Sequence, residues 1–247
     1  IRARVTFNTA VEHAERTEDG TWNIKLDNGE RRQYDALFVC NGHHWDPRWP
    51  EPSPQGEFSG TVIHAHHYLD AEPYLGKKVV VVGMGNSAMD IAVECSYVAD
   101  RVFLAHRRGT HIVPKYLLGR PVDKWTIAWM PWWIARYILG FMLWLQVGRM
   151  EDYGLKKPEH SLFQAHPSVS SVILDRIAHG DIEPRDNIAE LEGDLVRFAD
   201  GKVDEVDVII YCTGYKVTFP FFDESFIVAQ DNDLPLYKRM FKPGMDN

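Results

Sequence analysis

Residues 78–90 read Lys-Val-Val-Val-Val-Gly-Met-Gly-Asn-Ser-Ala-Met-Asp and carry the clearest structural signal in the chain. Four valines before a glycine are typical of a strand buried on both faces of a parallel sheet. The pattern Gly-x-Gly-x-x-Ala then leads into a predicted helix over residues 88–99. Gly83 allows the tight turn, Gly85 lets the backbone approach a pyrophosphate, and Ala88 lets helix and strand pack closely. Because the pattern lies between a strand and a helix, it predicts an α/β fold with a Rossmann-like dinucleotide-binding domain.

The start of this helix carries two polar residues, Asn86 and Ser87. A helix N-terminus has free N–H groups that bind the pyrophosphate anion. We expect Asn86 and Ser87 to donate hydrogen bonds to that anion or to hold the glycine turn. The alternative for Asn86 is a simple helix cap.

The next predicted strand, residues 101–105, is followed by Arg107 and Arg108. An NAD site usually has Asp or Glu about 20 residues after the glycines, where it binds the ribose 2′-OH. Here the acid is missing, and guanidinium groups suit a 2′-phosphate instead. The sequence therefore favours NADP(H) over NAD(H). The alternative is that Arg107 and Arg108 are a solvent-exposed strand end with no role in binding.

Composition narrows the class of protein. The 247 residues are 45% hydrophobic and 25% charged, which is typical of a globular chain with a sizeable core. A net charge of −8 disfavours a nucleic-acid partner. Cys40, Cys95 and Cys212 are widely separated, which indicates a reducing, cytoplasmic compartment without disulfides or a cysteine metal site. The chain opens on a strand-like segment without Met or signal peptide, so we expect a piece of a longer protein.

The first 42 residues are expected to form short antiparallel strands. Residues 21–26 alternate, and residues 34–40 read as a buried strand that ends in Asn41-Gly42. Asn-Gly permits a sharp exit from a sheet, and ligands bind open α/β sheets at such strand ends. His43 and His44, which follow this turn, are not expected to form a metal site.

Residues 125–147 form a tryptophan-rich segment whose single charge is Arg136 and which contains Pro131. Three alternatives stay open: packed helices at a substrate entrance or partner contact such as a homodimer, peripheral contact with a membrane interface, or a transmembrane span. Pro131 and Arg136 argue against the span. A stripe at helical spacing follows from residue 132 onward: Ile134, Ile138, Phe141 and Leu145.

Towards the end of the chain we expect a helix over residues 168–179, capped by Gly180, and then strands between 187 and 211. The last of these, residues 206–211, reads as buried. Thr213-Gly214 at its end is expected to approach a cofactor.

Several motifs, in order along the chain, resemble those of the flavin-containing monooxygenases. The central one is Phe-x-Gly-x-x-x-His-x-x-x-Tyr over residues 58–68, directly ahead of the glycine turn. Residues 40–44 and 207–216 resemble the two linker motifs of that family. Further matching segments are residues 106–110, residues 113–115, and His166-Pro167 ahead of residues 180–182.

The resemblance implies a two-dinucleotide-binding-domain flavoprotein in which an NADP(H) domain is inserted into an FAD domain. The family's earlier FAD glycine fingerprint and its last FAD-domain strand are not found in this sequence. We therefore expect a partial FAD domain and linker over residues 1–73, and a truncated return to it over 215–247. The NADP(H)-binding domain is expected over 74–214, with a helical insertion at about residues 119–150. The residues expected to bind FAD and NADP(H) are Asn41, Gly42, Gly83, Gly85, Asn86, Ser87, Ala88, Arg107, Arg108, Thr213 and Gly214.

The implied activity is an NADPH- and FAD-dependent monooxygenase that passes one atom of O2 to an amine or sulfide through a C4a-hydroperoxyflavin. The flavin carries the chemistry, so no catalytic side chain is predicted. The related Baeyer–Villiger ketone monooxygenases have Trp where this chain has Tyr68, which favours the amine and sulfide branch and leaves the other open. A non-catalytic NADP-binding fragment is a further alternative. A disulfide reductase is disfavoured, because the cysteines offer no local redox pair.

Overall fold

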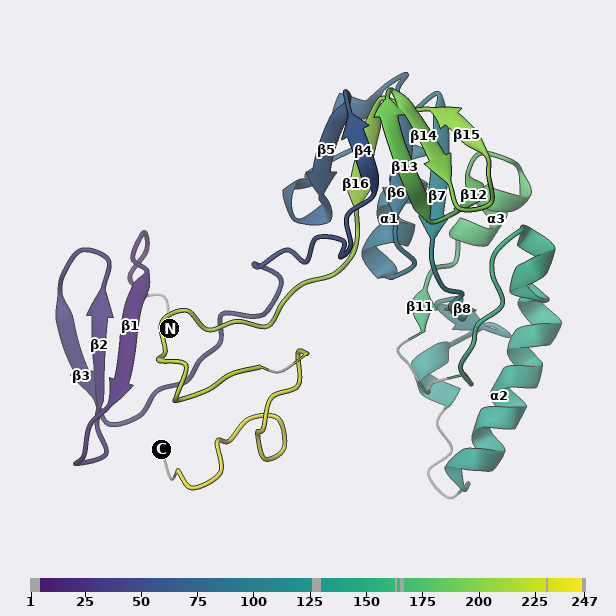
Figure 1. Cartoon of the computed structure of the whole chain (residues 1–247). Coiled ribbons are helices and arrows are strands. Elements are labelled where there is room, and N and C mark those ends of the chain that lie inside the picture. The colour runs from purple at the N-terminus through teal and green to yellow at the C-terminus, as the bar shows by residue number, and fades with distance from the viewer. Residues whose placement is uncertain (1–4, 126–129, 163, 165–166, 230, 246–247) are drawn as a thin grey trace. The chain divides into compact units, whose positions relative to one another are not determined.

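The computed structural model describes residues 5–125, 130–162, 164, 167–229 and 231–245 (Figure 1). The chain forms two compact units. One contains Ile1–Arg48 together with Tyr215–Asn247, and the other contains Trp49–Gly214. Each unit has its own hydrophobic core and is described by itself.

The larger unit is built on a five-stranded parallel sheet with the order β12-β7-β6-β16-β5. The central strand is β6 (Lys78–Val82), the predicted valine run, and its valines are buried. The parallel sheet and the helices that pack against it confirm the predicted α/β fold. The other four strands are β5 (Thr61–His64), β7 (Arg101–His106), β12 (Glu183–Asp186) and β16 (Val208–Tyr211).

Alternate valines of β6 point to two different cores, because successive side chains of a strand face opposite ways. Val79 and Val81 pack with α1 (Asn86–Cys95) and α3 (Ile173–Ala178). Val80 and Val82 pack on the other side, against a second sheet of order β15-β14-β13-β4. That sheet consists of β4 (Gln55–Phe58), β13 (Ile188–Gly193), β14 (Leu195–Phe198) and β15 (Val203–Glu205).

Two predicted helices have different bounds in the structure. The first begins at Asn86 and ends at Cys95, so it starts and stops earlier than residues 88–99. The second covers only Ile173–Ala178, because Ser168–Val169 forms strand β11, which pairs in parallel with β8 (Ile112–Val113). The Ser170 hydroxyl accepts from the N–H of Ile173 at 3.3 Å and so favours a helix start there. Gly180 follows the helix with a φ of +81°, as expected of its cap.

Helix α2 (Trp132–Val147) forms most of the tryptophan-rich segment, of which residues 126–129 lie outside the described part. Its buried face carries Leu139 and Leu143, which pack with Leu117 and Leu162. Most of the predicted stripe lies on the other side: Phe141 is 59% exposed. Within the described residues, no helix has the length and apolar character needed to cross a membrane.

Short elements complete this unit. They are η2 (Ala65–His67), η3 (Glu72–Tyr74), β9 (Tyr116–Leu117), β10 (Arg120–Pro121), η4 (Val122–Trp125) and η5 (Met150–Tyr153).

The smaller unit contains the antiparallel strands β1 (Val11–Arg16), β2 (Trp22–Leu26) and β3 (Arg31–Tyr34). Trp22 is buried against Phe222 and Phe226. The prediction of a buried strand over residues 34–40 is wrong: β3 ends at Tyr34, and Phe38 is 82% exposed. A strand buried on both faces needs pairing partners, and the described residues of this unit form no strand beside this segment.

Candidate functional site

The carboxyl ends of β6, β7 and β16 meet at one edge of the parallel sheet. The N–H of Gly83 donates to the carbonyl of Ala105 at 2.9 Å, and the N–H of Cys212 donates to the carbonyl of Val82 at 2.8 Å. The glycine turn, the arginine pair and Thr213 therefore follow three adjacent strands at the same edge. Ligands bind open α/β sheets at this end.

The two glycines of the turn differ in what they require. Gly83 has a φ of +144°, and a Cβ placed there would lie 2.6 Å from the carbonyl oxygen of Cys212. A side chain at Gly83 is therefore excluded by both conformation and space. Gly85 has a φ of −82°, and a Cβ there would meet no protein atom within 4 Å. The open space at Gly85 fits the backbone approach that a pyrophosphate needs.

The N-terminus of α1 faces solvent at Asn86 and Ser87, and its first turn carries no acidic residue. Gly85 is the N-cap and makes no side-chain cap bond, so Asn86 is the first helical residue rather than a cap. Its Oδ1 accepts from the N–H of Val169 at 2.8 Å, which ties the turn to β11. Ala88 is fully buried, as close packing of helix and strand requires. The helix thus offers exposed N–H groups to an anion.

Arg107 and Arg108 are exposed directly after β7. In the described part of the chain, neither guanidinium makes an ion pair with a carboxylate. The backbone carbonyl of Arg107 accepts from Lys156 Nζ at 3.3 Å. Sequence reasoning did not single out Lys156, because it lies far along the chain in a polar loop without a motif.

The segments around the two linker motifs lie side by side in the smaller unit. Pro47 and Tyr215 form an antiparallel bridge, and the N–H of Lys216 donates to the carbonyl of Asp46 at 2.8 Å. Gly42 has a φ of +70°, as expected of the Asn41-Gly42 turn. Asn41 and Gly42 belong to this unit, whereas Thr213 and Gly214 end the larger one.

His64 is the last residue of β5, and His66 and His67 lie in the turn η2 that follows it. His64 is buried, its Nδ1 accepts from the N–H of His66 at 3.1 Å, and burial lowers the pKa of its imidazole. The Tyr68 hydroxyl donates to Glu94 of α1 at 2.9 Å. These contacts attach the segment to the domain. Among the described residues, no three His, Cys, Asp or Glu side chains are grouped as metal ligands.

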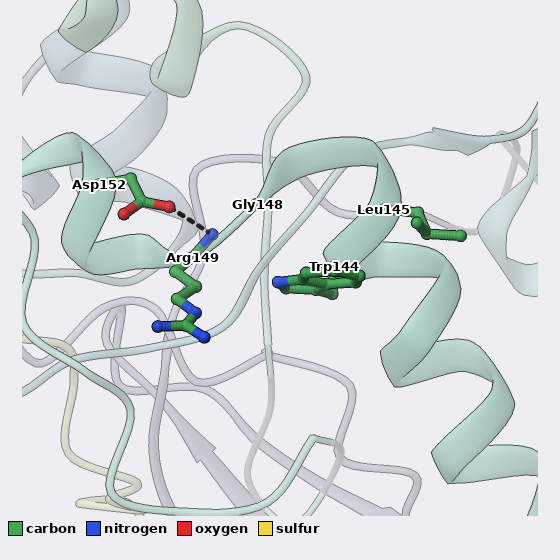
Figure 2. Close-up of a pocket in the computed structure, with 5 residues that line it drawn as sticks. All are labelled: Trp144, Leu145, Gly148, Arg149 and Asp152. Atoms are coloured by element: carbon green, nitrogen blue, oxygen red, sulfur yellow. Dashed lines mark hydrogen bonds between the residues drawn. The ribbon is translucent and has the colours of Figure 1, made fainter.

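A surface hollow of about 410 Å³ lies at the C-terminal end of α2 (Figure 2). Trp144 and Leu145 line it from the helix, Asp152 lines it from η5, and Arg149 lines it from the position just before η5. The Arg149 N–H donates to Asp152 at 3.2 Å, so the carboxylate already caps the turn. No residue predicted to bind a cofactor lines this hollow.

Similarity to known proteins covers the whole chain. The family model "Flavin-binding monooxygenase-like" matches residues 1–247. The chain is 33% identical to flavin-containing monooxygenase 5 of Rattus norvegicus over 100% of its own length and 48% of that protein. It is 32% identical to dimethylaniline monooxygenase [N-oxide-forming] 2 of Oryctolagus cuniculus, over 98% of the chain and 48% of that protein. The chain thus spans about half the length of these curated relatives.

Solved structures show the same fold. Tmm from Pelagibacter sp. strain HTCC7211 matches 90% of the chain and 38% of its own length, with a TM-score of 0.57 and 25% identity. Cyclohexanone monooxygenase in the Loose conformation covers 90% of the chain and 56% of its own length, with a TM-score of 0.69. Its 17% identity supports the fold alone. Together these matches show that the chain belongs to the flavin-binding monooxygenase family, whose members typically use FAD and NADPH.

Proposed function

We propose that residues 74–214, which lie within the larger unit, form the NADP(H)-binding domain of an FAD-dependent monooxygenase that oxygenates an amine or a sulfide. The observation that carries this proposal is the sheet edge where the glycine turn after β6 lies beside the exposed arginine pair after β7. That edge presents backbone N–H groups and guanidinium groups, and no carboxylate is paired with the arginines in the described residues.

Each group at this edge has a role in binding. The N–H groups at Asn86, Ser87 and Ala88 bind the pyrophosphate, with the space at Gly85 admitting it. Arg107 and Arg108 bind the 2′-phosphate with charged hydrogen bonds. By family resemblance, Asn41, Gly42, Thr213 and Gly214 are proposed as further cofactor-binding residues.

When bound, FAD would supply the oxygen-activating chemistry, with NADPH as the reductant. The protein then has to hold the nucleotide and exclude water, so an acid–base pair at the site is not required. In this proposal the smaller unit is part of the FAD domain. All three cysteines are free, which supports a reducing, cytoplasmic compartment.

The names of the relatives support the amine branch, since one is an N-oxide-forming dimethylaniline monooxygenase. Two other functions stay as alternatives. A Baeyer–Villiger ketone oxygenation is supported by the fold of cyclohexanone monooxygenase. A non-catalytic NADP-binding role is the second alternative, because the sequence contains one glycine fingerprint.

The exposed face of α2 is proposed to contact a membrane interface, since it presents Trp133, Tyr137, Phe141 and Trp144 to solvent. A substrate entrance and a homodimer contact are the alternatives for this face.

The test of the proposed function is turnover by the chain purified in the presence of FAD. NADPH oxidation and O2 uptake are followed with a tertiary amine, a dialkyl sulfide or a cyclic ketone, and the product is identified by mass spectrometry. An N-oxide or S-oxide formed in step with NADPH supports the proposal, and a lactone from the ketone supports the Baeyer–Villiger alternative. A colourless protein that binds NADP+ without turnover supports the non-catalytic alternative. Absence of NADP+ binding contradicts all three.

A further inference from the structure

The turn that carries Arg107 and Arg108 is held by a segment from a distant part of the chain. Gly109 forms a parallel bridge with Pro158, and a Cβ at Gly109 would lie 2.2 Å from the carbonyl oxygen of Lys156. The N–H of Lys156 donates to Nε2 of His106 at 3.1 Å. The segment after η5 therefore lies directly against the turn, backbone to backbone.

The Lys156 side chain bridges two neighbouring strand ends. Its ammonium group bonds Asp186 Oδ1 at 2.5 Å and the carbonyl oxygen of Arg107 at 3.3 Å. Asp186 is the last residue of β12 and lies opposite His106 in the parallel register. Its carboxylate also accepts from the N–H of Asn187 at 2.6 Å, so the acceptor is itself fixed.

In this arrangement Lys156 holds the turn in place, and the two arginines supply the positive charge that faces a ligand. Asp186 neutralises Lys156, whereas the guanidinium groups of Arg107 and Arg108 have no carboxylate partner in the described residues. The lysine fixes the peptide group from which both arginines extend. A preorganised pair of guanidinium groups binds a phosphate more tightly than a pair on a loose turn.

We propose that Lys156 is a positioning residue for the 2′-phosphate of NADP(H), acting through the carbonyl of Arg107 and the carboxylate of Asp186. This rests on the proposed function, in which the arginine pair binds that phosphate. The segment that follows α2 thereby sets the nucleotide preference of the sheet edge.

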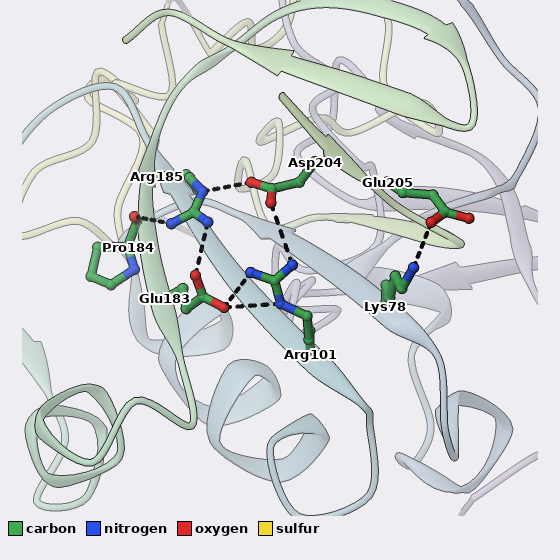
Figure 3. Close-up of polar contacts among 7 residues, drawn as sticks. All are labelled: Lys78, Arg101, Glu183, Pro184, Arg185, Asp204 and Glu205. Atoms are coloured by element: carbon green, nitrogen blue, oxygen red, sulfur yellow. Dashed lines mark hydrogen bonds and ion pairs between the residues drawn. The ribbon is translucent and has the colours of Figure 1, made fainter. Parts of the chain in front are cut away.

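The test measures dissociation constants of NADP+ and NAD+ for the whole chain by calorimetry. Lys156→Met is expected to weaken NADP+ roughly tenfold, the effect of one charged hydrogen bond, and to leave NAD+ nearly unchanged. Lys156→Arg is expected to recover part of the loss. The control is Lys78→Met, which removes a similar lysine–carboxylate pair with Glu205 at 2.6 Å (Figure 3). Lys78 is the first residue of β6, at the other end of the sheet, so its loss is expected to change neither constant.

Asp186→Ala separates positioning from long-range charge. This variant makes the turn more positive, so a purely electrostatic effect would tighten NADP+ binding. Positioning by Lys156 predicts weaker binding for Asp186→Ala as well. In an Arg107→Ala, Arg108→Ala background, Lys156→Met is expected to have no further effect on NADP+.

The outcomes distinguish the two proposals. A wild-type chain without preference for NADP+ overturns the nucleotide assignment and this inference with it. A wild-type preference that Lys156→Met leaves unchanged overturns the inference alone. Equal weakening of both nucleotides would show that Lys156 only supports the fold, and tighter NADP+ binding by Asp186→Ala would show that it acts through charge.

Discussion

The backbone N–H of Lys156 donates a hydrogen bond to Nε2 of His106, so the buried imidazole accepts it in its neutral form. The other ring nitrogen, Nδ1, then carries the proton and lies 3.4 Å from the carbonyl of Leu104. Burial and the nearby charge of Lys156 lower the pKa of His106 below its ordinary value. Protonation would remove the acceptor and place a second cation beside Lys156.

This hydrogen bond predicts that the free energy of unfolding decreases as the pH is lowered. Since the pKa of His106 is lower in the folded state than in the unfolded state, the folded state binds fewer protons between the two values. Its contribution is complete above about pH 6.5 and is lost as pH falls towards the folded pKa. The buried His64 acts in the same direction. We expect the free energy of unfolding by urea to decrease between about pH 7.5 and about pH 5.5.

The contribution of His106 is isolated by substitution. His106→Gln is expected to reduce the slope of stability against pH, because the amide does not titrate. A slope that is the same in the wild-type protein and in His106→Gln would contradict the neutral role of His106.

The two glycines of the turn should separate folding from nucleotide binding. Gly83→Ala forces a side chain into a left-handed conformation against the Cys212 carbonyl and should lower the free energy of unfolding by on the order of 3 kcal/mol. Gly85→Ala adds a methyl group to open space and should leave stability nearly unchanged while weakening NADP+. Urea unfolding and calorimetric titration give the two readouts. Tight NADP+ binding by Gly85→Ala would argue against a pyrophosphate at this turn.

The arginine pair should determine the choice of nucleotide. Arg107→Ala with Arg108→Ala is expected to weaken NADP+ by about 1.5–3 kcal/mol for each charged hydrogen bond lost, with little change for NAD+. Arg197→Ala, an exposed arginine on β14, is the matched control and should affect neither nucleotide. Equal losses for NADP+ and NAD+ would mean that the pair does not read the 2′-phosphate.

An ion-pair network that packs over Phe103 and Phe198 should contribute stability alone (Figure 3). Arg185, whose side chain is 10% exposed, donates to Asp204 at 2.7 Å and to Glu183 at 2.8 Å. Burial alone would raise the pKa of Glu183, but hydrogen bonds from Arg101 and Arg185 outweigh it and lower that pKa. The contribution of Glu183 is therefore present above its unfolded pKa and is lost as pH falls through the folded value.

Arg185→Met leaves two carboxylates partly buried with Arg101 as the remaining cation. It is expected to cost about 2 kcal/mol at neutral pH, between the values typical of exposed and of buried pairs. The loss should shrink under acidic conditions, where the carboxylates are protonated. NADP+ binding should not change, and a selective loss of NADP+ affinity would contradict a purely structural role.

Local signals made the central part of the fold predictable. The valine run, Gly83 and Ala88 lie within one short stretch, and their order is the signature of a buried strand, a tight turn and a closely packed helix. Lys156 could not be found this way, because its contact with Arg107 joins segments 49 positions apart. The strand expected over residues 34–40 failed for a related reason, since an apolar run forms a strand only where partners pair with it.

The orientation of α2 could not be read from the sequence, because the helix is apolar on nearly every side. The structure shows Leu139 buried and Trp144 49% exposed. Leu139→Ala should cost about 2–4 kcal/mol of unfolding free energy through a cavity in its cluster with Leu117 and Leu162. Trp144→Ser together with Phe141→Ser should lower the free energy of unfolding by less than about 1 kcal/mol for each residue, because both side chains are exposed to solvent and their removal leaves no cavity in the core.

The same pair of variants tests whether the exposed face of α2 contacts lipid. The wild-type chain and Leu139→Ala should co-sediment with phosphatidylcholine vesicles. The Trp144→Ser, Phe141→Ser variant should stay in the supernatant, because interfacial binding increases with exposed apolar area. If the wild-type chain does not co-sediment with the vesicles and is a dimer by ultracentrifugation, the exposed face of α2 joins two copies of the chain instead. If the wild type is monomeric and unbound, the substrate-entrance alternative gains, and the double variant should then alter turnover with large substrates more than with small ones.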